Sequence, residues 1–441
     1  MIDRIVIVND LSHAKGGASM LALEAAVQFA RRGHRVTYLC GSTGSRELEA
    51  EGIEVVALGH GRLLEGNRAK AMLNGLYNRP AAAMVARWLA RNDTPRTVYH
   101  VHGWSQILSP ALFSTMRPVR ERMLVHAHDF FFTCPNGAMF HFGRDAPCTA
   151  TPMSTTCLTS ACDRRGTVSK AWRSARQSIQ NRVLGADPPP LLLIHGGMAP
   201  YFARSGLSDS DMTVLPNPVI PWIPERIPAE ENRGVLFVGR MEATKGIDLA
   251  AEACRRAGVR LTAIGDGEML PDLRQRYPEM AWVGRRKPSE VSQFARYARV
   301  AVMPSRHIEP FGLAAVEALW SGLPVITSRD ALIAPDVVAA GAGLSVDPRD
   351  TAAFAAGLSA IFADDARTHE MSENAHRHTR ALAMSPERWI DALLDGYAGF
   401  LDGGRAGLLA AVRSSVGNAP EVPPTAIVLP FRNRRAARAG V

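Results

Sequence analysis

The sequence has few cysteines and lacks a long apolar run. Only six cysteines occur in 441 residues, and no apolar stretch approaches the roughly 18 residues needed to span a bilayer. The opening segment, MIDRIVIVND, reaches an acidic residue too early for the apolar core of a signal peptide. These absences predict a cytoplasmic chain with reduced thiols, and the length predicts about two domains.

The chain is basic, but the charge is not concentrated in one segment. The net charge of +9 is spread over the sequence and includes a short arginine-rich end at Arg432, Arg434, Arg435 and Arg438. Nucleotides, phospholipid surfaces and nucleic acid are all anionic partners of the kind that a basic protein attracts. Charge alone therefore does not choose among them.

The same supersecondary pattern opens the two halves of the chain. A strand over 4–8, an amphipathic helix over 18–33 and a strand over 35–40 form a βαβ unit. The pattern of strand, short loop, helix and strand is repeated from residue 234. We therefore predict an α/β fold of two Rossmann-like domains that face each other across a cleft, with ligands at the carboxyl ends of the strands.

Proline marks the boundary between the predicted domains. The segment LPNPVIPWIPERIP cannot form a helix or a central strand, so 216–232 is predicted to be a linker. Residues 1–215 then form the first domain and 233–386 the second. A helix over 387–402 is expected to return towards the first domain, and 403–441 to be a poorly ordered tail.

A basic loop follows the first strand of the second domain. The segment GRMEATKG places Arg240 and Lys245 between a strand and a helix, where two cations and free N–H groups can hold a diphosphate. The alternative is that both are surface charges on an ordinary turn, and the loop alone leaves the two interpretations open.

Two acids stand near the next predicted helix start. Pro310 disfavours helix at Glu309, so the helix should begin near Phe311 or Gly312 and leave Glu309 in the preceding loop. Glu317 lies in the middle of that apolar helix. An unpaired buried carboxylate is costly, so we expect a hydroxylated or cationic group to meet Glu317, such as a ribose.

These motifs together resemble a known enzyme family. The segments FVGRMEATKG, IGDGEMLPDL, VMPS and EPFGLAAVEALWSGLPVI are similar to the donor domain of GT-B fold retaining glycosyltransferases of family 4, which carry an E-x7-E motif. The similarity is strong over 213–345. It is looser over 1–212, where GGAS, VYHVHGW, LVHAHDF and VLPNPV carry it.

The resemblance implies roles for the acidic segment. Glu317 corresponds to the acid that binds the ribose hydroxyls of a nucleotide sugar, and Glu309 to the acid beside the transferred sugar. The backbone amides of Phe311, Gly312 and Leu313 would support the hexose and the diphosphate.

The resemblance also implies roles for residues on both sides of the cleft. Arg240 and Lys245 correspond to the cations that neutralise the leaving diphosphate, and Gly16 and Gly17 to the loop that closes over it. His128 corresponds to the histidine near the anomeric carbon, with Asp129 beside it. For these positions the plain alternatives are a loop-to-helix turn at the glycines and a satisfied polar side chain at the histidine.

The implied activity is transfer of a hexose, with retention, from a nucleotide-diphosphate sugar to a hydroxyl of a glycan or lipid-linked acceptor. No metal cofactor is expected for catalysis and no nucleic acid as a partner. A nicotinamide dehydrogenase is disfavoured because neither strand–helix loop contains G-x-G-x-x-G. A non-catalytic scaffold subunit of a glycan-assembly complex remains the alternative.

Four of the six cysteines fall in one stretch. Cys134, Cys148, Cys157 and Cys162 lie in a Gly-, Pro- and Thr-rich segment over 130–165, which we expect to be an excursion of the first domain over the cleft. Four thiolates could bind one structural zinc ion, although the stretch lacks C-x-x-C spacing. Free or partly buried cysteines are the alternative.

A basic helix is predicted directly after this stretch. Its sequence, SKAWRSARQSIQNRVLG, predicts one face with Trp172, Ala175, Ile179 and Val183 and another with Lys170, Arg173 and Arg176. An ordinary surface helix fits this pattern, and so does peripheral contact with an anionic membrane at the inner face of the cell membrane.

Overall fold

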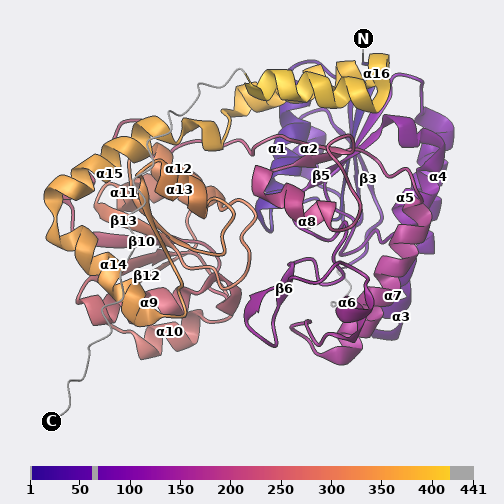
Figure 1. Cartoon of the computed structure of the whole chain (residues 1–441). Helices are drawn as coiled ribbons and strands as arrows, with labels where there is room; N and C mark the ends of the chain where they lie inside the picture. The colour runs from indigo at the N-terminus through magenta and orange to yellow at the C-terminus, as the bar shows by residue number, and fades with distance from the viewer. Residues whose placement is uncertain (1, 62–67, 418–441) are drawn as a thin grey trace.

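The computed structural model describes residues 2–61 and 68–417, which form two α/β domains side by side (Figure 1). The Arg-rich end at 432–438 and the last part of the predicted tail lie outside the described residues. The expected α/β class is confirmed, since each domain is built on a parallel sheet with helices around it.

The N-terminal domain contains a seven-stranded sheet in the order β3-β2-β1-β4-β5-β8-β9. Every pairing in it is parallel. The strands are β1 (Arg4–Asn9), β2 (Val36–Cys40), β3 (Glu54–Ala57), β4 (Thr97–Val101), β5 (Met123–Ala127), β8 (Leu191–Leu193) and β9 (Met212–Val214). Most are fully buried apolar runs, which is the pattern of a sheet covered on both faces.

Helices connect these strands. They are α1 (Gly17–Arg31), α2 (Arg46–Ala50), α3 (Arg68–Leu76), α4 (Arg79–Asn92), α5 (Ala111–Thr115), α7 (Thr167–Leu184) and α8 (Ala199–Ala203). The first βαβ unit, β1–α1–β2, matches the unit predicted from the sequence to within two residues at each boundary.

The C-terminal domain contains a six-stranded parallel sheet in the order β12-β11-β10-β13-β14-β15. Its strands are β10 (Gly234–Val238), β11 (Arg260–Ile264), β12 (Ala281–Gly284), β13 (Ala298–Met303), β14 (Val325–Ser328) and β15 (Gly343–Val346). Its helices are α9 (Ile247–Ala257), α10 (Leu270–Arg276), α11 (Pro288–Ala295), α12 (Leu313–Trp320), α13 (Ala334–Ala339), α14 (Thr351–Ala363) and α15 (Asp365–His378). The carboxyl ends of its strands face the N-terminal domain.

An excursion between β5 and α7 reaches across the cleft. It contains a small hairpin of β6 (Phe140–His141) and β7 (Ala146–Pro147), and the short helix α6 (Thr155–Thr159). Arg349 of the C-terminal domain pairs with Asp145 of this hairpin at 2.5 Å (Nε to Oδ2). Arg164 at the other end of the excursion pairs with Glu268 at 3.1 Å.

The last helix, α16 (Pro386–Gly417), lies along the N-terminal domain (Figure 1). It packs Trp389, Leu393 and Tyr397 into the core formed by β1, β2 and α1. The expectation of a poorly ordered tail from residue 403 is therefore wrong for 405–417, where the helix continues after a kink at Gly403 and Gly404. Leu408 and Val412 are buried against the same core, which explains the extra turns.

The burial of α7 does not follow the two faces predicted from its sequence, since Trp172, Ile179 and Val183 are only partly buried. Lys170 and Arg176 are 3% and 6% exposed, whereas Ala175 is exposed. The buried face is polar because the irregular excursion leaves backbone carbonyls that need donors: Gln177 and Gln180 both donate to the carbonyl of Phe132. The basic residues of α7 thus do not form the membrane-facing surface considered from the sequence.

No helix among the described residues combines the length and apolar character that crossing a bilayer requires.

Candidate active site

A cavity of about 1060 Å³ separates the two domains and is lined from both sides. The N-terminal domain supplies the loop before α1, the residues after β5 and part of the excursion. The C-terminal domain supplies the loops after β10 and β13 and the first turns of α12. Every site residue predicted from the sequence, the four cysteines excepted, lines this cavity.

The start of α12 is as predicted. The helix begins at Leu313, Gly312 precedes it in the left-handed conformation with φ at 81°, and Glu309 lies in the loop. A left-handed cap favours glycine, because other residues pay a steric cost there. The first N–H groups of a helix lack intrahelical partners, so this turn directs donors into the cavity.

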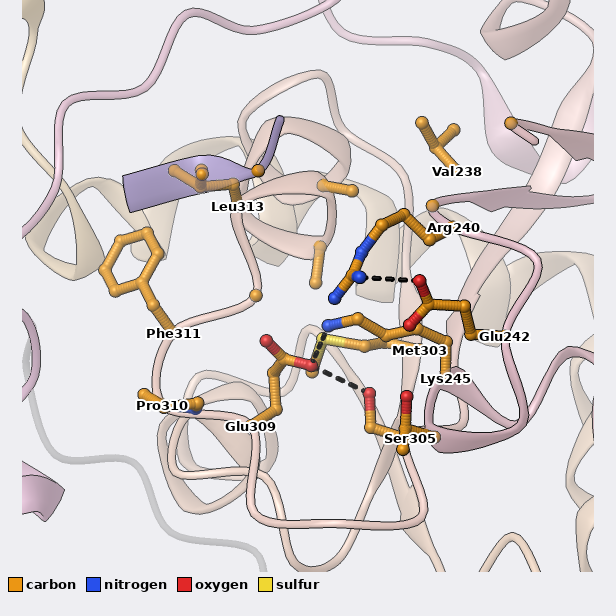
Figure 2. Close-up of a pocket in the computed structure, with 18 of the residues that line it drawn as sticks. Val238, Arg240, Glu242, Lys245, Met303, Ser305, Glu309, Pro310, Phe311 and Leu313 are labelled. Carbon is orange, nitrogen blue, oxygen red and sulfur yellow. Dashed lines mark hydrogen bonds and ion pairs between the residues drawn. The ribbon is translucent and has the colours of Figure 1, made fainter. Parts of the chain in front are cut away.

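Glu309 and Lys245 form an ion pair inside the cavity (Figure 2). Lys245 Nζ lies 2.5 Å from Glu309 Oε2, and the Ser305 hydroxyl donates to the same oxygen at 2.9 Å. Burial would raise the pKa of Glu309, but Lys245, His307 and Ser305 outweigh it and hold the pKa at about 2. Glu309 is therefore ionised at every physiological pH.

Arg240 points into the same space, where its guanidinium bonds Glu242 at 2.6 Å (Figure 2). Glu242 was not singled out from the sequence. Glu242 lies in the short turn between Arg240 and Lys245, which were predicted. Its position in GRMEATKG is the sequence signal that could have identified it. Two cations and two acids thus share one side of the cavity.

Glu317 faces the cavity from the middle of α12 and accepts a hydrogen bond from Trp222 Nε1 at 3.0 Å. Burial raises the pKa of this carboxyl to about 7, and the single hydrogen bond from Trp222 offsets it only in part. Trp222 was missed because it belongs to the proline-rich linker; a lone aromatic among prolines was its only signal. Glu317 is the one predicted site acid whose charge is not balanced by a cation among the described residues.

His128 and Asp129 enter the cavity from the carboxyl end of β5. His128 Nε2 lies 2.9 Å from His102 Nδ1. His102, the second histidine of VYHVHGW, therefore holds His128 in position. Burial lowers the pKa of His128 to about 3, and loss of surrounding water in the cleft raises that of Asp129 to about 6. His128 is a neutral hydrogen-bonding group at neutral pH.

Gly16 and Gly17 begin α1 directly opposite α12. A Cβ at Gly17 would lie 3.2 Å from Leu313 Cδ1, tighter than ordinary contact. The small residue therefore lets the two domains approach at this point. Phe311 is 2% exposed and anchors the loop on the other side.

The four cysteines do not gather into the tetrahedral site that zinc would require. Cys134, Cys157 and Cys162 are buried and Cys148 is partly exposed. Among residues 2–61 and 68–417, the only group of three or more possible ligands with donor atoms within 4.8 Å of one another consists of histidines. Asn136 instead bonds Cys134 and Cys162, and Lys170 lies 3.4 Å from Cys157 Sγ.

The half of the cavity with the ion pairs lies in the part of the chain that matches a family model. The family model of glycosyl transferases group 1 matches residues 222–378. The similarity to this family therefore falls within the C-terminal half of the chain. The match includes Trp222, Arg240, Lys245, Glu309 and Glu317, and ends within α15.

Relatives extend the likeness beyond this domain. Glycogen synthase of Mycobacterium tuberculosis is 29% identical over 273 residues, which cover 58% of this chain and 63% of the relative. The chain thus aligns with less than two thirds of that enzyme.

Solved structures share the fold. Sucrose-phosphate synthase from Thermosynechococcus elongatus superimposes with a TM-score of 0.66 at 18% identity, over 91% of this chain and 100% of the other. Anabaena Alr3699/HepE, solved in complex with UDP-glucose, gives a TM-score of 0.63 at 15% identity, over 90% and 99% of the two chains. The predicted GT-B architecture is therefore confirmed.

Proposed function

We propose that the protein is a retaining glycosyltransferase of family 4, which moves a hexose from a nucleotide-diphosphate sugar to a hydroxyl of a glycan or lipid-linked acceptor. The observation that carries the proposal is the clustering of Arg240, Lys245, Glu309 and Glu317 in one interdomain cavity, inside a group 1 domain.

The cavity suits a nucleotide sugar in its arrangement of charge. Lys245 and Arg240 both hold an acid of the same domain, and these contacts use only part of their hydrogen-bonding capacity. A diphosphate could share these donors. Glu317, which lies in the middle of α12 and not in the loop of the two cations, would accept the ribose hydroxyls. A relative of the same fold solved with UDP-glucose supports a donor of this class.

Cleavage of the sugar–phosphate bond develops negative charge on the departing diphosphate. Fixed cations aimed at that charge stabilise the transition state more than the ground state, and this lowers the barrier. Lys245 is held in place by Glu309, so it is oriented before the donor binds. The proposal assigns this task to the two side chains, with the helix start at Gly312 as a third source of donors.

The N-terminal domain would receive the acceptor. His128 is neutral and reaches the cavity beside Asp129, whose raised pKa makes it a candidate to accept a proton from an attacking hydroxyl. Three arginines of the excursion and α7 line the same side of the cavity, Arg164, Arg165 and Arg173. An acceptor with an anionic group, such as a lipid-linked phosphate, fits that lining. We place such an enzyme in polysaccharide or glycolipid biosynthesis, at the inner face of the cell membrane.

A thermal-shift screen with nucleoside diphosphates and their sugars tests the donor. A ligand that binds only the folded state raises the melting temperature, by an amount set by its concentration relative to its dissociation constant. We expect one base to stabilise the wild-type protein and to lose most of its effect in Glu317→Gln. Donor hydrolysis followed by nucleotide release separates an enzyme from a scaffold subunit, which would bind without turnover.

A further inference from the structure

Four histidines lie on one face of the N-terminal sheet, and three of them lie behind the cavity that His128 lines. His100 belongs to β4 and His102 directly follows it, while His126 belongs to β5 and His128 follows it. Residues two apart on a strand share a face, and His100 is in register with Leu124, so His102 and His126 stand at the same level. Helix α16 covers this face of the sheet.

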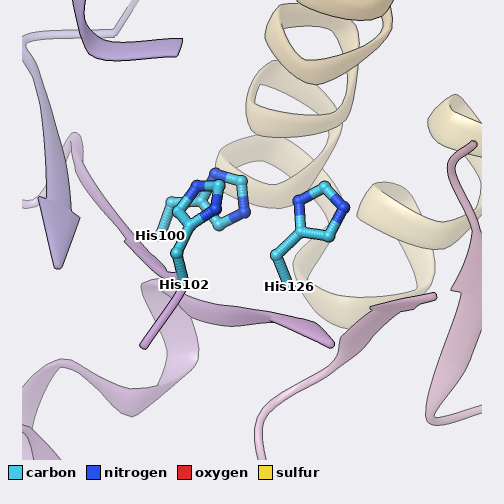
Figure 3. A group of neighbouring side chains, drawn as sticks. All are labelled: His100, His102 and His126. Carbon is cyan, nitrogen blue, oxygen red and sulfur yellow. The ribbon is translucent and has the colours of Figure 1, made fainter. Parts of the chain in front are cut away.

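Three of these side chains are enclosed. His100, His102 and His126 are 0%, 4% and 0% exposed. One ring nitrogen from each lies within 4.8 Å of the others (Figure 3). Nε2 of His100, Nε2 of His102 and both nitrogens of His126 have no hydrogen-bond partner among the described residues. Buried polar atoms nearly always have a hydrogen-bond partner. Four unpartnered nitrogens so close together therefore indicate that a further species binds between the rings.

The outer nitrogens of two of the rings are already engaged. His100 Nδ1 lies 2.6 Å from the Tyr397 hydroxyl of α16, and His102 Nδ1 lies 2.9 Å from His128 Nε2. With the proton on Nδ1 of each ring, the unpartnered Nε2 atom of each carries the free lone pair. Histidines that bind a metal show this pattern, in which the far N–H donates to a second group.

A water molecule and a metal ion would use the three rings differently. A water molecule has two protons, so it satisfies two lone pairs and needs an N–H from the third ring, whereas a metal ion accepts a lone pair from each of the three. We propose that His100, His102 and His126 bind a divalent first-row transition metal ion of the kind that prefers imidazole, such as Zn²⁺. A neighbouring cavity of about 20 Å³, lined by His102, His126, His128 and Asp129, has room for one water molecule as the fourth ligand.

The ion would act on the architecture of the site. It ties β4 to β5, and through His102 it fixes the ring of His128 at the edge of the cavity. It lies on the N-terminal side, away from Arg240 and Lys245, so it is separate from the binding of the diphosphate. The inference does not depend on the proposed function.

The first test is elemental analysis of the full chain, purified without chelators or metal columns. We expect about one transition metal ion per chain, as a single three-histidine site would hold. His126→Phe, which fills the same space with an apolar ring, should lose that ion. His369→Gln, a control at a half-exposed histidine that bonds Glu230, and Cys148→Ser, a control for the cysteine stretch, should keep it.

The second test uses wild-type protein, so it does not depend on whether a variant folds. Chelator-treated protein titrated with Co²⁺ should bind one equivalent, with the visible absorption of a low-symmetry imidazole site and without a thiolate charge-transfer band. Added Zn²⁺ should raise the melting temperature of the same sample until the site is saturated. Three outcomes would overturn the proposal: failure of the wild type to bind metal, a thiolate band in the cobalt spectrum, or full retention of the ion by folded His126→Phe.

Discussion

The two sides of the cavity are built in different ways. On the C-terminal side, Lys245, Ser305 and Glu309 come from two loops of one domain and bond one another directly. On the N-terminal side, His128 is held by His102, and the neighbouring His100 contacts Tyr397, which lies 297 residues away along the chain. The first arrangement is local and the second depends on the packing of the whole domain.

The two sides of the cavity have different tasks in the proposed reaction. Two ion pairs stand where a diphosphate would leave, and neutral imidazole and a weakly acidic carboxyl stand beside arginines where an acceptor would approach. Changes on the C-terminal side should therefore act on the donor and on its transition state. Changes on the N-terminal side should act through domain packing and the approach of the acceptor.

The largest effect is expected at the two cations. Lys245→Ala and Arg240→Ala should each lower kcat by about 10²–10³, the cost of removing one preorganised donor from a developing oxyanion. The Michaelis constant for the donor should change much less, because the charge that they meet grows in the transition state. Steady-state kinetics of nucleotide release measures both constants.

Arg256→Ala is the matched control for these variants. Arg256 lies on the outer face of α9 and pairs with Glu252, so its removal changes net charge by the same amount without touching the cavity. Kinetics that match the wild type are expected there. A raised Michaelis constant at unaltered kcat in Lys245→Ala would contradict the assignment to the leaving group, provided that its melting temperature shows an intact fold.

Much of the C-terminal side could be predicted from the sequence because its geometry is set within short segments. Pro310 ends the loop that holds Glu309, and Gly312 supplies the left-handed turn from which α12 begins. Local rules of this kind need no knowledge of remote packing. The Lys245–Glu309 ion pair was not predicted. The two residues are 64 positions apart, and only the order of strands in the parallel sheet brings them together.

The N-terminal side was predicted less well, and α7 shows why. Its periodicity predicted an apolar face that includes Ile179, but the most deeply buried residues of the helix include Gln177 and Gln180. The reason is the unmet hydrogen-bonding capacity of the excursion, which overrides the pattern of the helix itself. The same holds for the tail, where the core under α16 extends the helix to Gly417. Interactions with remote parts of the fold leave no signal within the sequence of the segment itself.

Substitution of Glu317 should have the next largest effect. Glu317→Gln keeps the shape of the side chain but removes a charge-assisted hydrogen bond, which costs about 1.5 to 3 kcal/mol. Donor affinity measured by calorimetry should fall about 10- to 150-fold. The fold should remain intact, since Trp222 Nε1 can still donate to the amide oxygen. An unchanged affinity would make Glu317 a structural acid and would favour the scaffold alternative.

The pH dependence of donor binding should give a smaller effect. The pKa of Glu317 is raised to about 7 from an ordinary value of 4.5, so the folded protein holds its proton between these values while the unfolded chain does not. Stability contributed by this group is therefore lost as pH rises through that window. Donor affinity should move in the opposite direction, because the ribose hydroxyls meet the ionised form. One pH unit below 7 the donor affinity should be about tenfold weaker than one pH unit above 7, because most of the carboxyl is then protonated. Glu317→Gln should abolish this dependence.

The smallest effect is expected at the contact that joins the two sides. Asp145 on the hairpin of the excursion is half-exposed and pairs with Arg349 across the cavity mouth at 2.5 Å. Pairs of this exposure contribute about 0.2 to 1 kcal/mol and weaken with salt. Asp145→Asn should therefore lower kcat/KM by less than about fivefold at low ionic strength and by less still at high salt.

Arg349 also bonds Asp330 and Asp347 within its own domain, so Arg349→Gln alone cannot isolate the contact. A double-mutant cycle of the two changes does, because it cancels the bonds made inside the C-terminal domain. A coupling near zero would mean that the Asp145–Arg349 pair does not help to hold the excursion over the cavity. A coupling of a few tenths of a kcal/mol, removed by salt, would show that the C-terminal domain helps to close the side of the cavity that depends on long-range packing.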